Sequence, residues 1–199
     1  MEVKIIDGTI DPLYSISNAA RMSTNTQDKN DANTREEFVR ARIRNGEENL
    51  LEHAYVQLDI RGISRACLQQ LVRHRYHVCY TVESQRYVNQ ENAQFIIPPE
   101  AKRLGLDKVF EDTYRLCMSA YVSLVNKGVK KEDARYLLPE ATSTNLIITY
   151  NFRGLRHLLR MRCDKKAQWE IRELAYKIRQ VVYEHYGTDF FAEGLGVKK

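Results

Sequence analysis

The stretch LVRHRYHVCYTVESQRYVN, residues 71–89, decides how the rest of the chain is interpreted. It opens with an Arg-His-Arg triplet at 73–75 and continues to Ser-Gln-Arg at 84–86. Arginine keeps its positive charge in proteins, so clustered guanidinium groups repel each other unless anions lie among them. Arginine also binds phosphate through paired hydrogen bonds. The stretch therefore predicts a site for a phosphorylated ligand.

The chain around this stretch has the composition of a globular protein. It contains 199 residues, 43% hydrophobic and 29% charged, and has no linker-like segment, so a single domain over residues 1–199 is expected. No apolar run approaches the roughly 18 residues of a membrane span, and the N-terminus shows no secretory signal. The four cysteines are widely spaced and form no CxxC pair, which argues against a zinc site or a disulfide scaffold and fits a reducing cytoplasm: Cys67, Cys79, Cys117 and Cys163.

The element pattern indicates a mixed α/β (α+β) fold, because short strand candidates alternate irregularly with long helix candidates. Strands are expected at 55–60, 80–88 and 146–150, and helices at 35–45, 106–126, 152–162 and 167–186. Thr34 and Ser64 are candidate helix caps. The 106–126 helix has five candidate core positions: Val109, Tyr114, Leu116, Tyr121 and Leu124. No GxGxxG or GxxxxGK[ST] motif occurs, which disfavours a Rossmann or P-loop phosphate site.

A second basic cluster, NFRGLRHLLRMR at 151–162, contains four arginines and no acidic residue. On a helix, Arg153, His157 and Arg160 share one face. Two interpretations stay open for such a helix. It is either a ligand-binding face, or it has a purely structural explanation, namely a solvated basic face or arginines paired with acids such as Glu170 and Glu173. The net charge of +5 also leaves a basic nucleic-acid-binding protein as an alternative.

Three separated elements together resemble the flavin-dependent thymidylate synthases (ThyX): RHR with SQRYV at 73–88, EDARYLLP at 132–139 and NFRGLRHLLRMRCDKKAQWEIR at 151–172. AARMS at 19–23 and the segment 49–75 also resemble that family, so the resemblance covers most of the chain in the family's order. The family signature is RHR, about seven residues, then serine. Here the connector, residues 76–83, has eight residues.

The resemblance implies a ThyX-type fold, with a central, mostly antiparallel sheet flanked by long helices, in a homotetramer whose subunits share active sites. It implies reductive methylation of dUMP to dTMP with FAD as cofactor, methylenetetrahydrofolate as carbon donor and NADPH as reductant. The longer connector keeps a near alternative open. An enzyme of the same fold could act on another pyrimidine nucleotide, or could add a hydroxymethyl group.

The resemblance also assigns roles to residues, and no metal ligand is among them. The expected FAD-binding residues are Arg73, His74, Arg75, Asn49, Asn151, Arg153 and His157. The expected nucleotide-binding residues are Gln70, Ser84, Gln85, Arg86, Arg135 and Arg162. Arg162 is also the candidate catalytic residue, because a fixed guanidinium stabilises the negative charge that develops on the uracil ring.

Simpler roles remain for several of these side chains. Ser84 is interpreted as a nucleotide contact rather than a nucleophile, although a serine bonded only to backbone would look the same. His74 could cap a helix end, and Arg162 could form a salt bridge between helices. Cys79 and Cys163 are more typical of small packed side chains than of catalytic thiols.

Overall fold

The computed structural model describes residues 1–196. Its strands are β1 (Glu2–Gly8), β2 (Tyr55–Ser64), β3 (Val78–Val82) and β4 (Ser143–Asn151). Its α-helices are α1 (Pro12–Met22), α2 (Ala32–Arg44), α3 (Arg65–Leu71), α4 (Pro99–Arg103), α5 (Asp107–Asn126), α6 (Lys131–Ala134), α7 (Phe152–Arg162) and α8 (Trp169–Tyr186). The short 3₁₀ helices are η1 (Gln27–Lys29), η2 (Glu48–His53), η3 (Arg135–Leu137) and η4 (Phe190–Ala192).

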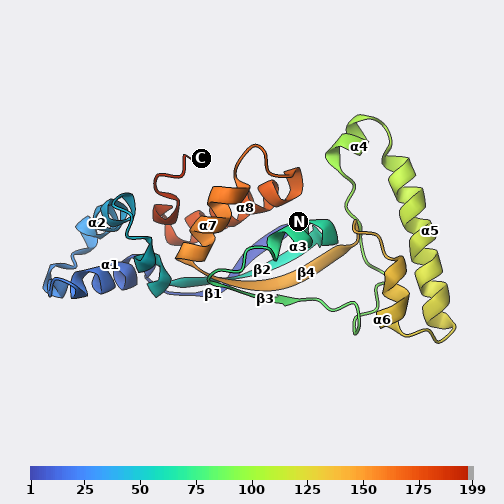
Figure 1. The fold of residues 1–199 in the computed structure, drawn as a ribbon, viewed down its shortest axis with the longest axis horizontal. Helices are drawn as coiled ribbons and strands as arrows, with labels where there is room; N and C mark the ends of the chain where they lie inside the picture. The colour runs from blue at the N-terminus through green and yellow to red at the C-terminus, as the bar shows by residue number, and fades with distance from the viewer. Residues whose placement is uncertain (197–199) are drawn as a thin grey trace. The chain divides into compact units, whose positions relative to one another are not determined.

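The strands form one antiparallel sheet in the order β1-β2-β4-β3 (Figure 1). This combination of one sheet with many helices confirms the mixed α/β fold class that the sequence predicts. No helix within residues 1–196 is long and apolar enough to cross a membrane.

The chain divides into two compact units, which are described separately. Unit 1 comprises residues 1–60, 71–80 and 147 onward, and unit 2 comprises residues 61–70 and 81–146. Strands β2, β3 and β4 each contribute residues to both units. The expectation of a single domain over residues 1–199 stays a prediction.

The core of unit 1 is built on strand alternation. Val56, Leu58 and Ile60 on β2 are fully buried, while the residues between them are exposed or partly buried, as the pattern of residues 55–60 predicts. Helices α7 and α8 pack on each other, and α8 packs on β1 (Figure 1). Both helices contribute fully buried aliphatic side chains to the core: Leu155, Leu158, Leu159, Ile171, Leu174 and Ile178.

In unit 2, α5 packs beside α6 and η3 (Figure 1), and two tyrosines two turns apart anchor it. The Tyr114 hydroxyl donates to the Ala93 carbonyl at 3.0 Å, and the backbone N–H of Gln90 donates to the Tyr121 hydroxyl at 3.2 Å. Both tyrosines are buried, as predicted. The core positions expected at Val109 and Leu116 are wrong, since these side chains are 59% and 72% exposed. The buried face of α5 is therefore narrower than the set of hydrophobic residues along the helix indicates.

The expected cap at Thr34 is also wrong, whereas the cap at Ser64 is confirmed. Helix α2 begins earlier than predicted, and its cap is Asp31, whose carboxylate accepts the Thr34 amide at 3.2 Å. A carboxylate is at least as good a cap as threonine, so the helix starts at the earlier residue. The Ser64 hydroxyl accepts the Cys67 amide at 2.9 Å and starts α3.

The strand predicted over residues 80–88 is too long, because β3 ends at Val82. The amides of Tyr87 and Val88 donate to the Ser84 carbonyl at 3.2 and 2.9 Å. This local turn takes the backbone groups that a strand would give to its neighbour. Ser84 therefore lies in a turn rather than on a sheet.

Candidate active site

The Arg-His-Arg triplet forms a turn directly after α3. The His74 amide donates to the carbonyl of Leu71, the last helical residue, at 3.1 Å. This turn buries His74, which is 6% exposed, and leaves Arg73 and Arg75 exposed on either side. The turn thus presents two cations to solvent around one buried imidazole.

His74 contacts two predicted site residues on α7. Arg162 donates from Nε to Nε2 of His74 at 2.8 Å. The His157 ring meets the His74 ring edge to face, with centroids 5.4 Å apart. The two basic clusters, which are 88 residues apart at His74 and Arg162, therefore meet within unit 1.

The contact with Arg162 fixes the protonation state of His74. A guanidinium can only donate, so Nε2 must accept and the ring is neutral, with its hydrogen on Nδ1. Burial, helped by the charges of Arg162 and His157, lowers the pKa of His74 to about 4. Its Nδ1 is buried and has no hydrogen-bond partner among residues 1–196. A buried donor of this kind is suited to a ligand acceptor.

The start of α7 lies against the connector that follows the triplet. The side-chain oxygen of Asn151 caps the helix by accepting a hydrogen bond from the backbone N–H of Gly154 at 2.9 Å. The backbone N–H of Asn151 donates to the His77 carbonyl at 3.1 Å. A Cβ at position 154 would lie 2.7 Å from the His77 carbonyl oxygen and 2.9 Å from that of Tyr76. Only glycine allows this approach. His77 itself has a φ of +56°, a conformation that costs energy in a non-glycine residue.

Three of the four arginines on α7 pair with glutamates of η2. Arg153 pairs with Glu52, while Arg156 and Arg160 both bind Glu48 Oε1, at 2.8 and 2.5 Å. The open alternative of arginines paired with acids therefore holds for these three. Their partners are on η2 rather than at the positions 170 and 173 considered from the sequence.

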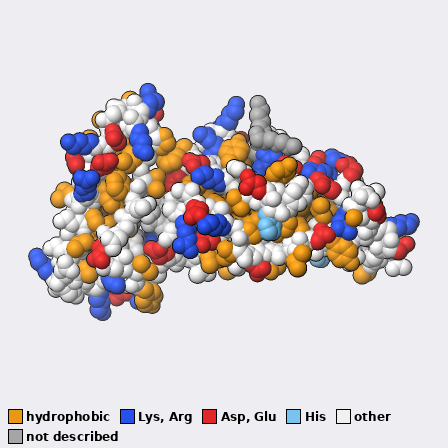
Figure 2. Space-filling model, turned by 180° about the vertical axis from the view of Figure 1, so that it is seen from behind, with side chains coloured by type: hydrophobic (Ala, Val, Ile, Leu, Met, Phe, Trp, Pro, Cys, Tyr) orange, Lys and Arg blue, Asp and Glu red, His pale blue; other side chains and the backbone are white. Residues whose placement is uncertain are grey.

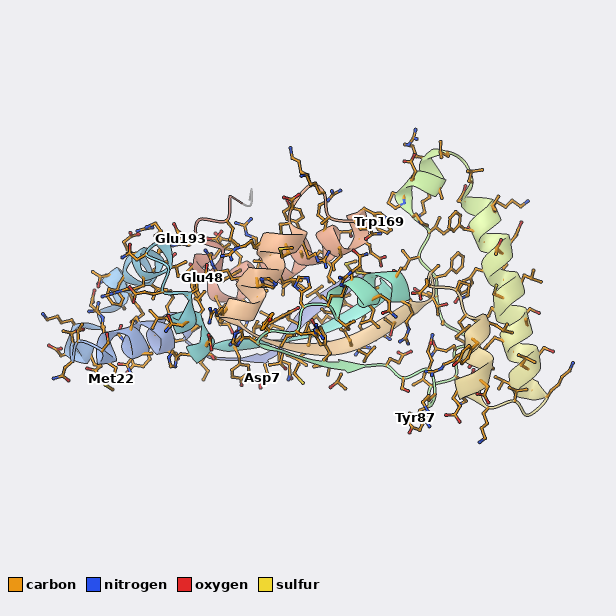
Figure 3. All side chains as sticks on the ribbon, viewed as in Figure 1. Asp7, Met22, Glu48, Tyr87, Trp169 and Glu193 are labelled. Carbon is orange, nitrogen blue, oxygen red and sulfur yellow. The ribbon has the colours of Figure 1, made fainter. Side chains whose placement is uncertain are left out.

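Arg156 also joins α7 to the chain that follows α8. It is buried, and its Nη1 donates to the carbonyls of Phe191 at 3.1 Å and Glu193 at 2.5 Å. Figure 3 shows Glu48 and Glu193 close to α7. Although burial alone would raise the pKa of Glu48, hydrogen bonds and charge from Arg156 and Arg160 lower it. Arg156 therefore has a structural role.

The structure supports Asn49, Asn151 and Arg153 as cofactor ligands less directly than it supports His74 and His157. Asn49 is exposed on η2, Asn151 caps α7, and Arg153 is paired with Glu52. Nothing in these contacts forbids a ligand, because the Arg153 pair is partly exposed and an exposed ion pair contributes little. Their roles stay predictions.

In unit 2, two of the predicted nucleotide-binding residues, Arg86 and Arg135, contact Glu132, whereas Arg162 of the same set lies in unit 1. Arg86 donates from Nε to Glu132 Oε2 at 2.7 Å, and Arg135 donates from Nε to the Glu132 carbonyl at 3.1 Å. The Ser84 hydroxyl accepts the Arg86 amide at 3.2 Å, which is the backbone-bonded arrangement left open above. That bond uses one lone pair and leaves the hydroxyl hydrogen for another partner.

Two of the predicted residues, Gln85 and Arg135, line a polar cleft of about 510 Å³ in unit 2. The other residues that line it are Arg65, Leu68, Gln69, Tyr136, Leu138, Pro139 and Glu140. Ser84, Arg86 and Gln70 are not among the lining residues within the described chain. Gln85 and Arg135 thus lie on one cleft, together with residues that the sequence did not single out.

Arg65 is the most informative of these additional residues. Its Nη2 donates to the Glu83 carbonyl at 3.0 Å, while its Nε is buried without a partner among residues 1–196. Burial lowers the pKa of Arg65, the charges of Glu83 and Glu140 act against this, and the charge of Arg135 acts with it. The cleft thus carries two guanidinium groups, which can bind an anion, beside the carboxylate of Glu140. The signal in the sequence was an arginine directly after a helix cap.

Cys163, next to Arg162, is not activated as a nucleophile. Burial raises the pKa of Cys163 to about 11, so its thiol stays protonated at neutral pH. Cys79 is exposed on β3. Residues 1–196 contain no group of three His, Cys, Asp or Glu side chains that could hold a metal ion.

Comparison with known sequences identifies the family. A family model described as "Thymidylate synthase complementing protein" (Thy1) matches residues 4–186. A flavin-dependent thymidylate synthase of Geobacter sulfurreducens is 37% identical, over 98% of this chain and 88% of that protein. One from Pyrococcus furiosus is also 37% identical, over 89% of this chain and 77% of that protein.

Two solved structures share the fold. Thymidylate synthase X from Helicobacter pylori, crystallised with FAD and dUMP, has a TM-score of 0.78 at 24% identity, covering 96% of this chain and 99% of that one. The UMP/dUMP methylase PolB from Streptomyces cacaoi, bound with 5-Br dUMP, has a TM-score of 0.83 at 23% identity, covering 99% and 97%. Taken with the match over residues 4–186 and the relatives at 37% identity, the chain belongs to the flavin-dependent thymidylate synthase family.

Proposed function

We propose that this protein converts dUMP to dTMP by reductive methylation, with FAD as redox cofactor, methylenetetrahydrofolate as carbon donor and NADPH as reductant. The family assignment confirms the predicted enzyme class and its dependence on a flavin. The observation that carries the proposal is the contact between Arg162 and a neutral, buried His74. It brings the two arginine clusters of the sequence into one group.

The Arg-His-Arg turn has the chemistry to hold FAD. The exposed guanidinium groups of Arg73 and Arg75 can bind a diphosphate. The Nδ1–H of His74, which has no partner among residues 1–196, can donate to an acceptor on the cofactor. His157, in contact with His74, is a further candidate. When bound, FAD supplies the redox chemistry, while these side chains bind and orient it.

Arg162 is proposed to activate the pyrimidine. For C5 of uracil to act as a nucleophile, negative charge must develop over the ring carbonyl oxygens and N3. A guanidinium already held in place stabilises that charge without reorganising during the reaction. The hydrogen bond to His74 uses Nε–H, on one side of the planar guanidinium group, and fixes the direction of the other N–H donors.

The cleft of unit 2 is proposed to bind the nucleotide phosphate. Arg65, Arg135 and Gln85 supply cationic and amide donors there. Arg86, Ser84 and Gln70 complete the predicted nucleotide set, and Arg86 would exchange its exposed pair with Glu132 for the phosphate. We further propose a homotetramer with shared active sites, acting in the cytoplasm.

Turnover with defined nucleotides tests the proposal. The protein is incubated under low oxygen with methylenetetrahydrofolate, NADPH and labelled dUMP, and in parallel with UMP or dCMP. We expect labelled dTMP from dUMP, and a purified protein that is yellow and releases FAD on denaturation. Modification of UMP or dCMP with dUMP left unchanged would show that the substrate is another pyrimidine nucleotide. A hydroxymethylated product would show that the enzyme transfers a hydroxymethyl group instead of a methyl group.

The nucleic-acid-binding alternative predicts a colourless protein with steeply salt-dependent binding to DNA or RNA. On the face that Figure 2 shows, basic and acidic side chains lie next to one another rather than in a basic stripe. On α7, too, three arginines are each paired with a glutamate of η2. This interspersed charge weighs against a nucleic-acid surface on that face.

A further inference from the structure

The connector after the Arg-His-Arg turn carries a tyrosine that none of the proposed roles uses. Tyr80 on β3 is partly buried, and its hydroxyl lies 2.7 Å from the carbonyl of His74 and 2.8 Å from that of Leu71. Leu71 ends α3, where the last carbonyls of a helix lack helical partners. The single phenolic hydrogen is shared between the two carbonyls, so it ties the helix end and the turn to β3.

A second tyrosine lies behind the first. The hydroxyl oxygens of Tyr150 and Tyr80 are 3.3 Å apart, and Tyr150 on β4 is fully buried. Burial raises the pKa of both hydroxyls, so both stay protonated at neutral pH. Since Tyr80 gives its hydrogen to the carbonyls, Tyr150 donates to the Tyr80 oxygen. The bonds thus run in one direction, from Tyr150 through Tyr80 to the backbone of His74.

We propose that Tyr80 is a positioning residue for Arg162. Its hydroxyl holds the His74 carbonyl, which sets the direction of the imidazole whose Nε2 accepts the Arg162 Nε–H. The catalytic part of this inference rests on the proposed function, in which Arg162 stabilises charge on the pyrimidine. The structural part does not, because it concerns only the orientation of His74.

The connector has a second, independent anchor, which makes the role of Tyr80 separable from folding. The His77 carbonyl accepts the Asn151 amide at 3.1 Å and lies directly against Gly154. We expect that anchor to stay when the Tyr80 hydroxyl is removed. The expected result is a local change at the turn, with the connector still held to α7.

The test is Tyr80→Phe, which keeps the ring and removes the hydroxyl. The first readout is the pKa of His74, from NMR titration of histidine-labelled protein with the resonance assigned by its loss in His74→Gln. The groups around this imidazole are Arg162 and His157 of α7, the Tyr80 hydroxyl, and the flanking Arg73 and Arg75. As the turn loosens, we expect the pKa to rise from about 4 toward its ordinary value of 6.5.

The second readout is steady-state kinetics with dUMP. We expect kcat to fall about tenfold, less than the 10²–10³ typical when the electrostatic donor itself is lost, with KM for dUMP changed less than about twofold. Tyr183→Phe is the matched control, since Tyr183 is exposed on α8. It should leave both readouts unchanged. Tyr150→Phe should change both in the same direction as Tyr80→Phe, by less, because the Tyr80 hydroxyl remains.

The outcomes separate this inference from the proposed function. An unchanged His74 pKa together with unchanged kcat in Tyr80→Phe would overturn it. A raised pKa with unchanged kcat would overturn the positioning of Arg162. A wild-type protein that makes no dTMP would overturn the proposed function, and a raised His74 pKa in the variant would still support the role of Tyr80 in orienting that ring. If Tyr80→Phe fails to fold, the same readouts on Tyr150→Phe decide.

Discussion

Arg156 and Arg162 lie on the same helix, α7, but differ in what holds them. Arg156 is buried and binds a carboxylate and two backbone carbonyls. Arg162 is partly buried and rests on the neutral imidazole of His74. The first arrangement satisfies the guanidinium within the protein and fastens α7 in place. In the second, a neutral imidazole of the predicted FAD-binding set holds the Nε–H of the guanidinium.

The largest effect is expected from Arg156→Ala. Removing one partner of a buried ion pair leaves Glu48 less compensated and two carbonyls without their donor. The free energy of unfolding should fall by about 3–5 kcal/mol. Urea titration at fixed protein concentration measures this loss. Arg160→Ala is the matched control, because it removes an exposed arginine from the same glutamate and should cost about 1 kcal/mol or less. Equal losses in the two variants would contradict the comparison.

Arg162→Ala should have the opposite profile, with stability largely kept and turnover lost. Removing a fixed electrostatic donor typically lowers kcat about 10²–10³-fold. The measurement is dTMP formation at saturating dUMP, alongside the flavin absorbance of the purified variant, which should stay near that of the wild type. Arg160→Ala again serves as the control and should change kcat less than about twofold. Normal turnover in a folded, yellow Arg162→Ala variant would remove Arg162 from the chemistry.

Much of this arrangement could be predicted from the sequence. The strand at residues 55–60, the Ser64 cap and the helix at 152–162 follow from local patterns, and the structure confirms each. The family and the enzyme class followed from the order of three motifs, and the fold class from the pattern of strands and helices; the comparisons and the structure confirm them. The contact of His74 with Arg162 is long-range, and the resemblance placed both residues in one site without specifying that contact.

What the sequence could not provide was the pairing of charges. Arg153, Arg156 and Arg160 look alike in the sequence, and their partners Glu48 and Glu52 lie about a hundred residues earlier. Which arginine is neutralised depends on how η2 packs on α7, and that is tertiary information. Arg65 was missed for the same reason, because its cleft is formed with residues 135–140.

The protonation state of His74 gives a prediction about pH. Its pKa of about 4 in the folded protein lies below the 6.5 of an unfolded histidine, so between these values the unfolded state binds more protons. The contribution of His74 to the free energy of unfolding is fully present above pH 6.5 and is lost as the pH falls toward 4. The free energy of unfolding, measured from pH 7 to 4.5, should therefore decrease less steeply in His74→Gln than in the wild type.

The pH range chosen separates His74 from the acidic residues. Glu48 and Asp189 have lowered pKa values, because the hydrogen bonds and charges of neighbouring arginines outweigh the effect of burial. Their contributions are lost only below the ordinary values of 4.5 and 3.8. The other histidines are the same in both proteins. Identical slopes in wild type and His74→Gln would contradict a neutral, Arg162-bound imidazole.

The smallest effect on stability is expected from Arg153→Ala, which tests whether an arginine with a glutamate partner still serves a ligand. Its pair with Glu52 is partly exposed, so the free energy of unfolding should change by about 1 kcal/mol or less. If Arg153 contacts FAD, the variant should retain severalfold less flavin after gel filtration. Glu52→Gln is the informative control, because it weakens the same pair but keeps the guanidinium. Equal flavin loss in both variants would mean that the ion pair holds α7 for the cofactor, whereas loss in Arg153→Ala alone would place the guanidinium on the flavin.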